Sequence, residues 1–283
     1  MRWWCSSETV AWDWTWRPYV GVWLFILAMA IAYFLHLRRL DGSDRGRHAA
    51  FFSSGLLVLW AALDWPLGTL GASYLASVHV LQFLLIALVA PPLLLAGFPR
   101  ASFTALQRRP RVWGLLEKVT QPLMAFFVFN VVMTVGHWPS VVDALMTSQL
   151  GSFALDIAWL AGGIVFWWPI VAPVPARPRF SFLPKIGYLA LNGLLIRPPT
   201  LVMLYAKFPV YALYELAPPI PGTSAIDDQQ LAGAVMKVGS AWIMMAGIAV
   251  LFYLWYRTVT GERGAGSGEP ATHPLEGAGH PST

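Results

Sequence analysis

The chain has 283 residues, of which 57% are hydrophobic and 12% are charged, and its mean hydropathy is +0.58. A soluble domain of this length has too little interior to bury that much apolar surface, so the composition indicates an integral membrane protein. No other sign of nucleic-acid binding accompanies the formal net charge of +5, so we expect no nucleic-acid partner.

Seven apolar runs follow one another along the chain, each close to the roughly 20 helical residues that cross about 30 Å of hydrocarbon. The runs are apolar on nearly all sides, whereas strands of a membrane barrel would alternate apolar and polar residues. We therefore predict one all-α, polytopic transmembrane domain over residues 18–257. Its seven helices are expected near residues 18–37, 48–66, 74–97, 121–138, 151–171, 185–206 and 230–256.

Lysine and arginine residues are distributed unevenly between the segments that separate these runs. Most of the 19 follow the first, third, fifth and seventh runs, and the positive-inside rule makes that side cytoplasmic. We therefore expect an extracytoplasmic N-terminal segment, 1–17, with an interfacial tryptophan belt, and a disordered cytoplasmic tail, 258–283, rich in Gly, Pro and Ser. The basic residues of the cytoplasmic side are Arg38, Arg39, Arg45, Arg47, Arg100, Arg108, Arg109, Arg111, Lys118, Arg177, Arg179, Lys185, Arg257 and Arg263.

A few polar residues interrupt the apolar runs at similar depths in the predicted outer half. His79 lies about 8 Å below the outer end of the third run at 1.5 Å per residue, and Gln82 is one turn deeper on the same face. Charges in hydrocarbon cost several kcal/mol unless they are paired or hydrated, so this layer is a candidate site. Its other members are Met133 and His137 on the fourth run, Asp156 on the fifth and Lys237 on the seventh.

Two imidazoles and a thioether in an apolar setting favour Cu(I) over hard cations, and a nearby carboxylate can assist its capture or release. On ligand type we name four candidate metal ligands: His79, His137, Met133 and Asp156. The structural alternatives are hydrogen bonding of His79 to a neighbouring helix and simple packing of Met133. Cys5 is the only cysteine, which excludes a disulfide within one chain.

Prolines interrupt the third and sixth runs. Pro91 and Pro92 are expected to bend or end the third helix. In the sixth run Arg197 is followed directly by two prolines, so the helix must break there and its freed carbonyl groups need partners. We expect Arg197 to form a structural ion pair with Asp156 on the preceding span.

The chain carries five stretches in a characteristic order: "SVHVLQFLLIALVAPPLLLAGFP" (77–99), "GHWPSVVDAL" (136–145), "GGIVFWWPIVAPVP" (162–175), "PVYALYELA" (209–217) and "DQQLAGAVMK" (228–237). Together they resemble the CtaG family of polytopic membrane proteins, and the resemblance covers most of residues 20–257. It implies a membrane-embedded factor for assembly of cytochrome c oxidase, acting through copper supply. It further implies oxidase subunits and the lipid bilayer as partners and a multi-pass location in the cell inner (plasma) membrane.

The chain departs from the family pattern at three places. The family tends to read His-x-x-Gln-His in the third span, and here His79 and Gln82 match while Phe83 replaces the second histidine. Relatives usually carry histidines near the outer end of the fifth span, where this chain has Asp156, and an aromatic residue at the position of Lys237. Because ligand type and number set affinity, these differences imply weaker copper binding than in relatives.

Oxidase assembly is the first hypothesis, with the loop 208–229 as the surface for the partner. No HExxH, glycine-rich phosphate loop or Ser-His-Asp grouping is visible, so we do not expect an enzyme. The alternative is a transporter for copper or another small solute, since discontinuous helices often flank substrate sites. A retinal-type photoreceptor would use Lys237, yet the third run offers no carboxylate as counter-ion. Otherwise Lys237 is expected to extend toward the outer interface.

Overall fold

The structure is a computed structural model that describes residues 2–40, 44–172, 181–195 and 197–266. Every regular element in these ranges is helical, which confirms the predicted all-α class. In chain order the elements are α1 (Val20–Arg38), α2 (Arg45–Leu63), α3 (Leu67–Ser73), α4 (Ala76–Leu84), the π-helix η1 (Leu85–Val89), α5 (Ala90–Ala96), α6 (Arg100–Gln107), α7 (Pro110–Val119), α8 (Pro122–Gly136), α9 (Pro139–Leu145), α10 (Gln149–Val171), α11 (Phe182–Leu194), α12 (Pro198–Tyr205), α13 (Ala212–Glu215) and α14 (Ala225–Gly266).

Five helical runs in the described residues are long and apolar enough to cross a membrane: Val20–Arg38, Ala76–Ala96, Gln149–Val171, Phe182–Tyr205 and Ala225–Thr260. Two bent pairs, α2 with α3 at 44° and α7 with α8 at 74°, raise the number to the predicted seven if each pair is one span. The bend before α8 follows from Pro122, because a proline disfavours helical backbone at the residue before it. Helix α14 continues to Gly266, so residues 258–266 of the predicted tail are helical, and residues 267–283 lie outside the described residues.

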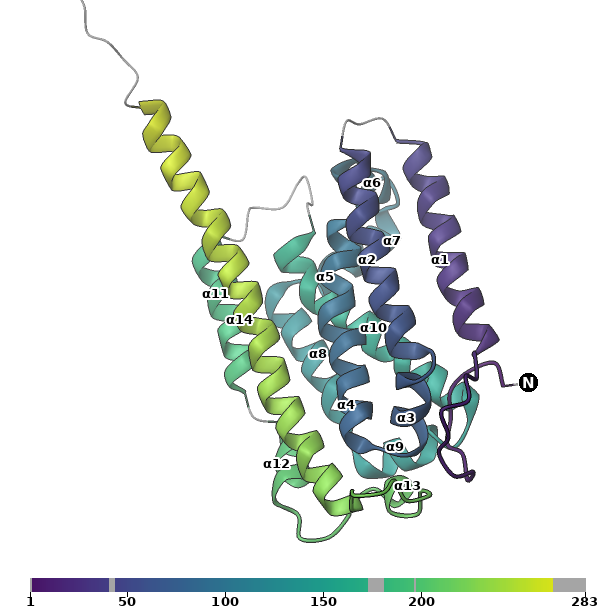
Figure 1. Ribbon diagram of the computed structural model, residues 1–283. Coiled ribbons are helices and arrows are strands. Elements are labelled where there is room, and N and C mark those ends of the chain that lie inside the picture. The colour runs from purple at the N-terminus through teal and green to yellow at the C-terminus, as the bar shows by residue number, and fades with distance from the viewer. Residues whose placement is uncertain (1, 41–43, 173–180, 196, 267–283) are drawn as a thin grey trace, which may run out of the picture.

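The continuous run of α4, η1 and α5 forms the centre of the bundle. It is the most buried of the five candidate spans, at 67%, and it packs against α2, α10 and α14. In Figure 1, α14 runs along one edge of the bundle and α1 along the other, with α11 and α12 beside α14. Most residues of α4 are therefore buried against other helices, although Leu81 is 38% exposed.

The outward faces of the peripheral helices are strongly apolar. Leu24 on α1 is 60% exposed, Leu123 on α8 is 71% exposed and Trp242 on α14 is 70% exposed. Apolar patches of this extent are rare on soluble monomers, whereas lipid tails provide an apolar surrounding for them. The surface thus agrees with a membrane protein.

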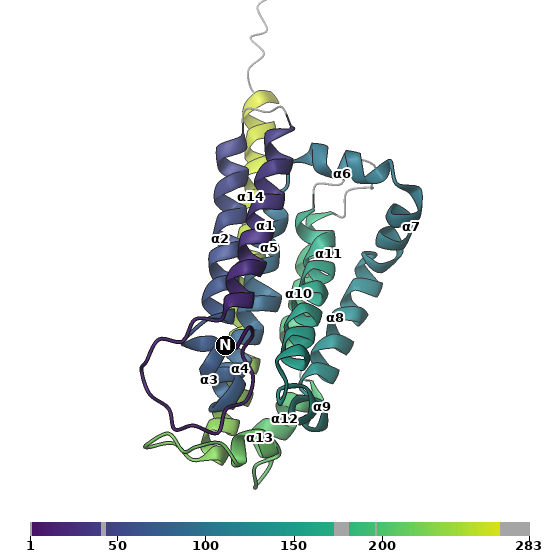
Figure 2. The ribbon, with the colours of Figure 1, turned by 90° about the vertical axis from the view of Figure 1, so that its right-hand side faces the viewer.

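The two ends of the bundle carry different segments of the chain (Figures 1 and 2). One end, here called the basic end, carries α6, the last turn of α1 and the first turn of α2, together with the C-terminal part of α14. The other, here called the histidine end, carries residues 2–18, α3, α9 and α13. Most predicted cytoplasmic arginines lie at the basic end, while Arg177 and Arg179 fall outside the described residues. That the basic end faces the cytoplasm stays a prediction.

The third span does not end at its two prolines, contrary to one of the two outcomes expected from the sequence. The helix widens into η1 just before Pro91, and the N–H of Ala90 bonds to the carbonyl of Leu85. Prolines have no N–H to offer the carbonyl of Ala87, which lies instead against α10 at Gly163. A Cβ at Gly163 would stand 2.1 Å from that oxygen, so only glycine permits this approach.

The N-terminal segment is packed into the bundle, and Trp4 does not belong to the interfacial belt predicted for it. Trp4 is fully buried between aromatic rings of α1 and α10, and its Nε1–H donates to Asp156 Oδ2 at 2.8 Å. Cys5 is buried with its Sγ 3.7 Å from Ser152 Oγ. Trp14, in contrast, is 71% exposed, as a belt residue should be. Because Asp156 accepts the hydrogen bond of its indole N–H, Trp4 can be buried without leaving a polar group unpaired.

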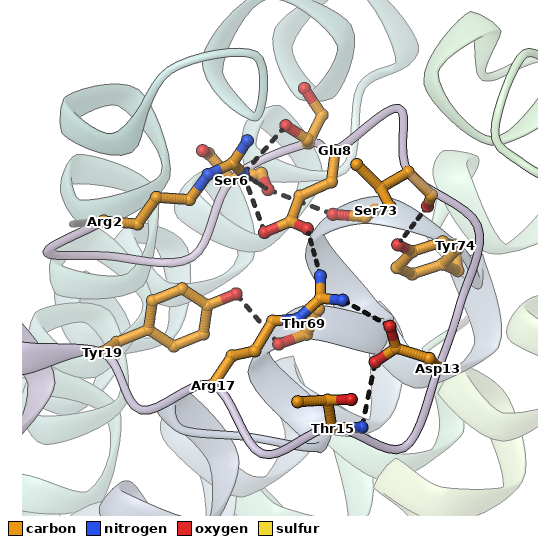
Figure 3. Close-up of polar contacts among 12 residues, drawn as sticks. Arg2, Ser6, Glu8, Asp13, Thr15, Arg17, Tyr19, Thr69, Ser73 and Tyr74 are labelled. Atoms are coloured by element: carbon orange, nitrogen blue, oxygen red, sulfur yellow. Dashed lines mark hydrogen bonds and ion pairs between the residues drawn. The ribbon is translucent and has the colours of Figure 1, made fainter.

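A cluster of ion pairs closes the N-terminal segment over the histidine end (Figure 3). The Glu8 carboxylate contacts Arg2 at 2.9 Å and Arg17 at 3.1 Å, and Arg17 also meets Asp13 at 2.7 Å. The hydroxyl of Ser73 on α3 donates to the Ser6 carbonyl at 3.0 Å. Because Glu8 is nearly inaccessible, these ion pairs within the segment are screened less than surface pairs. The hydrogen bond from Ser73 joins the segment to α3.

The docked N-terminal segment predicts slow chemistry at Cys5. Burial raises the pKa of the Cys5 thiol above its usual range, with a smaller contribution from Asp156, so little reactive thiolate is present. In the folded protein we expect maleimide labelling to be about 100-fold slower than in dodecyl sulfate. Trp4→Ala should restore much of the rate, measured by mass spectrometry of the single adduct. Equal rates in folded and denatured wild-type protein would show that the segment is not docked.

Candidate functional site

His79 is positioned by the first turn of α4. The carboxylate of Asp228, from α14, accepts hydrogen bonds from the backbone N–H groups of Ala76 and Ser77 and from the Ser77 hydroxyl. A carboxylate at this place satisfies free N–H groups and complements the helix dipole, so α4 begins at a defined point. His79 follows within one turn and is only 3% exposed.

His137 is positioned by the end of α8, where it is the C-cap residue and is fully buried. Its Nδ1 lies 2.8 Å from the carbonyl oxygen of Met133. Because a carbonyl only accepts, Nδ1 carries the hydrogen, and Nε2 is left with a free lone pair. This second-sphere arrangement is usual for histidines that bind metals, since it fixes the tautomer and ring orientation.

Six residues from four parts of the chain form one buried group, here called the histidine cluster: His79, Gln82, Phe83, His137, Trp159 and Tyr214. The ring centroids of His79 and His137 are 5.8 Å apart. The ring of Trp159 lies 5.0 Å from that of His79 and stacks on His137 at 5.1 Å and 14°. The structure therefore brings together the two histidines that the sequence singled out.

Polar atoms of the histidine cluster lack hydrogen-bond partners among the described residues. These buried atoms are Nδ1 and Nε2 of His79, Nε2 of His137 and Nε1 of Trp159, whereas the Gln82 amide lies within reach of the Cys5 thiol. Leaving a buried polar group unpaired costs about 1–3 kcal/mol, and native proteins rarely do so without a reason. Several such atoms in one place indicate a site for a small polar molecule or an ion.

Residues 6–258 match the sequence model of a family described as "Cytochrome c oxidase caa3 assembly factor (Caa3_CtaG)". The chain belongs to this CtaG family. It is also 22% identical, over 277 residues, to an uncharacterized protein of Mycobacterium leprae (strain TN). That alignment covers 86% of this chain and 40% of the relative, so the chain spans less than half of the relative's length. No solved structure matches this CtaG protein.

The other two candidate ligands of this CtaG protein lie near the same end with different surroundings. Met133 is buried, and its carbonyl orients His137. Asp156 is buried, and its Oδ2 accepts the hydrogen bond from Trp4. No group of three or more His, Cys, Asp or Glu side chains in the described part of the chain is arranged to hold a metal ion. The metal roles of Met133 and Asp156 stay predictions.

The ion pair expected between Arg197 and Asp156 is not formed. Arg197 Nε donates to Asn130 Oδ1 at 2.7 Å, and its Nη2 donates to Asn192 Oδ1 at 2.5 Å. Its guanidinium also lies 5.9 Å from the ring centroid of Phe129. Two amides from α8 and α11 thus surround the cation at the helix break, whereas Asp156 faces the N-terminal segment.

Lys237 supplies the partners that the broken helix needs. Its Nζ donates to the carbonyls of Gly193 at 2.9 Å and Leu194 at 3.0 Å, where α11 ends. The expected extension toward the interface is therefore replaced by a cation at a helix C-terminus, where the dipole favours it. The Lys237 nitrogen, which a retinal Schiff base would require, is thus already hydrogen-bonded to two backbone carbonyls.

Phe83 occupies the position of the third span where the resemblance described above implies a second histidine. Its ring lies 4.6 Å from His137 and 5.3 Å from Trp159. An apolar ring cannot donate a lone pair, so this CtaG protein has one imidazole fewer in the cluster than the family pattern implies.

Sequence reasoning missed Trp159 and Tyr214 as members of the cluster. Tyr214 reaches His79 from the loop between α12 and α14, at 6.0 Å between ring centroids. Its hydroxyl donates to the Gly71 carbonyl at 2.7 Å. Aromatic residues are so frequent here that neither position stood out. The only available signal was that "PVYALYELA" belongs to the stretches that resemble the family.

Proposed function

We propose that this chain is a membrane-embedded assembly factor for a cytochrome c oxidase that holds Cu(I) as cargo at His79 and His137. The observation that carries the proposal is the pair of buried imidazoles, whose ring centroids are 5.8 Å apart. Both ring nitrogens of His79 and Nε2 of His137 have no hydrogen-bond partner among the described residues. Because the chain belongs to the caa3 assembly factor family, we infer that a cytochrome c oxidase receives the Cu(I).

The donors of the histidine cluster fit a soft ion of low coordination number. Structural Zn²⁺ sites use four protein ligands, and Ca²⁺ or Mg²⁺ sites require several oxygens. His79 and His137 offer two imidazoles in apolar surroundings formed by Phe83 and Trp159. Imidazole suits copper, and a cargo ion must be released again, so few ligands are an advantage for delivery.

The partner surface of the proposal is the loop 208–229 at the histidine end. Its short helix α13 is held by Asp143, whose carboxylate accepts from the N–H groups of Ala212 and Leu213. Phe208 is 68% exposed and Leu216 is 83% exposed on this loop. A rigid loop that presents apolar side chains next to the cargo site fits docking of an oxidase subunit. The proposal places the protein in the plasma membrane with this loop outside.

A transporter is less well supported than an assembly factor. The broken sixth span was the feature that favoured transport, and its polar groups bond to one another through Arg197, Asn130 and Asn192. Such mutual pairing supports a structural role for the break.

The proposal predicts an oxidase defect in cells that carry His79→Ala with His137→Ala. In a strain deleted for the chromosomal gene, the wild-type gene should restore assembled oxidase at limiting copper, and the double variant should restore less than about a tenth of it. The amount of assembled oxidase is measured by the haem a absorbance of membranes and by immunoblots of the oxidase subunits.

The matched control is His36→Ala with His48→Ala, since these two histidines lie at the basic end and bond to Ser102 and to the Ala96 carbonyl. This variant should support normal oxidase. A normal oxidase level in the deletion strain itself, at both low and adequate copper, would refute the assembly function.

A further inference from the structure

Helix α6 lies across the basic end of the bundle, and α7 leads from it back to α8 (Figure 2). One side of α6 is attached to the bundle, since Phe103 is buried and Ser102 Oγ lies 2.8 Å from His36 Nε2. Arg100 at its start and Arg108 just after its end are both exposed. The helix therefore holds guanidinium groups at the end of the bundle, at the level where basic residues meet lipid headgroups.

The connection between α6 and α7 concentrates positive charge. Arg108, Arg109 and Arg111 are all exposed, and none of them forms an ion pair with another described residue. No aspartate or glutamate occurs from residue 99 to residue 116, so no carboxylate within this stretch offsets the three charges. Guanidinium groups bind phosphate through paired N–H donors, and this connection offers three of them close together in sequence.

Helix α7 presents apolar side chains directly beside these arginines. None of its residues is buried, and its main contacts are with α6 and α8, its neighbours in the chain. Val112 is 51% exposed, and Leu115, one turn after Arg111, is 67% exposed. The exposed apolar surface continues on α8 at Leu123 and Phe127. A helix that combines basic and exposed apolar side chains in this way is suited to the boundary between headgroups and acyl chains.

We propose that α6 and α7 form a binding site for an anionic phospholipid at the basic end of the bundle. Arg108, Arg109 and Arg111 bind the headgroup phosphate, and Val112 and Leu115 contact the acyl chains. The uncompensated positive charge selects an anionic lipid over a zwitterionic one, because basic residues near a bilayer surface are attracted to net negative headgroups. The apolar side chains select a lipid over a soluble phosphate. The inference does not depend on copper binding.

The proposal predicts that the purified full chain retains anionic lipid selectively. The protein in neutral detergent is mixed with equal amounts of phosphatidylglycerol and phosphatidylcholine, and the bound lipids are counted by native mass spectrometry. The wild type should retain at least about tenfold more phosphatidylglycerol, since each basic residue near the headgroups contributes about a fivefold preference. Combining Arg108→Gln, Arg109→Gln and Arg111→Gln should lower this ratio at least about fivefold.

The matched control combines Arg38→Gln, Arg39→Gln and Arg257→Gln, which removes the same charge from exposed arginines at the same end. The control should keep the wild-type ratio. An equal loss in both variants would show that net charge alone sets the preference, and this result would overturn the site, as would a wild type without any preference. Glycerol 3-phosphate in excess should not displace the lipid. Its displacement of phosphatidylglycerol would contradict the proposal by indicating a site for a free anion.

Discussion

Replacing Gly163 with alanine is expected to lower the free energy of unfolding by about 2–3 kcal/mol. The added Cβ would stand 2.1 Å from the carbonyl oxygen of Ala87 and 2.8 Å from Pro91 Cγ. The first of these is a backbone atom, so α10 must move away from η1 as a whole. The central span would lose packing along its length, since η1 and α5 both contact α10. Thermal unfolding in one detergent, followed by tryptophan fluorescence, measures the change.

Gly187→Ala is the control for this substitution. Gly187 is also inside a helix, α11, but a Cβ there meets nothing within 4 Å. Alanine is favoured over glycine in helices by about 1 kcal/mol, so this variant should be as stable as the wild type or slightly more stable. Opposite effects of the two alanines are predicted. Equal unfolding midpoints would show that α10 does not approach η1 as closely as described.

Removing both imidazoles of the histidine cluster is expected to weaken Cu(I) binding by at least about 100-fold. His79→Ala and His137→Ala each remove one of two nitrogen ligands, so each single variant should already show most of the loss. Competition with a chromophoric Cu(I) chelator under anaerobic, reducing conditions measures the dissociation constant. The His36→Ala, His48→Ala variant should bind as the wild type does.

The same titration tests the remaining predicted ligands. Met133→Leu preserves packing but removes the thioether, and Asp156→Asn keeps an acceptor for Trp4 but removes the charge. Each should weaken Cu(I) binding if the side chain is a ligand. An unchanged dissociation constant for either variant would remove that residue from the site and leave its structural contact as its role.

Most of the architecture could be predicted from the apolar runs. The run predicted over 151–171 became α10, Gln149–Val171, and the run over 74–97 became the span Ala76–Ala96. Length and hydropathy suffice here because a membrane helix satisfies its backbone hydrogen bonds internally. The pairing of His79 with His137 followed from depth alone, since His79 lies in the first turn of its helix and His137 directly follows the last turn of its own, at the same end of the bundle.

Contacts between distant segments could not be predicted in this way. Depth in a span does not tell which way a side chain faces, and for this reason Asp156 was assigned to Arg197 instead of Trp4. The N-terminal segment has no long apolar run, so nothing in its pattern showed that Trp4 and Cys5 enter the bundle. The close approach of the π-helix to Gly163 likewise joins positions that are distant in sequence.

X-ray absorption at the copper edge of the Cu(I)-loaded protein tests the cargo site most directly. We predict a first shell dominated by nitrogen, with the outer-shell scattering of imidazole rings from His79 and His137. In the double alanine variant that imidazole scattering should disappear. A spectrum with the same imidazole scattering in the wild type and the double variant, or a wild-type shell without imidazole, would contradict copper binding at this pair.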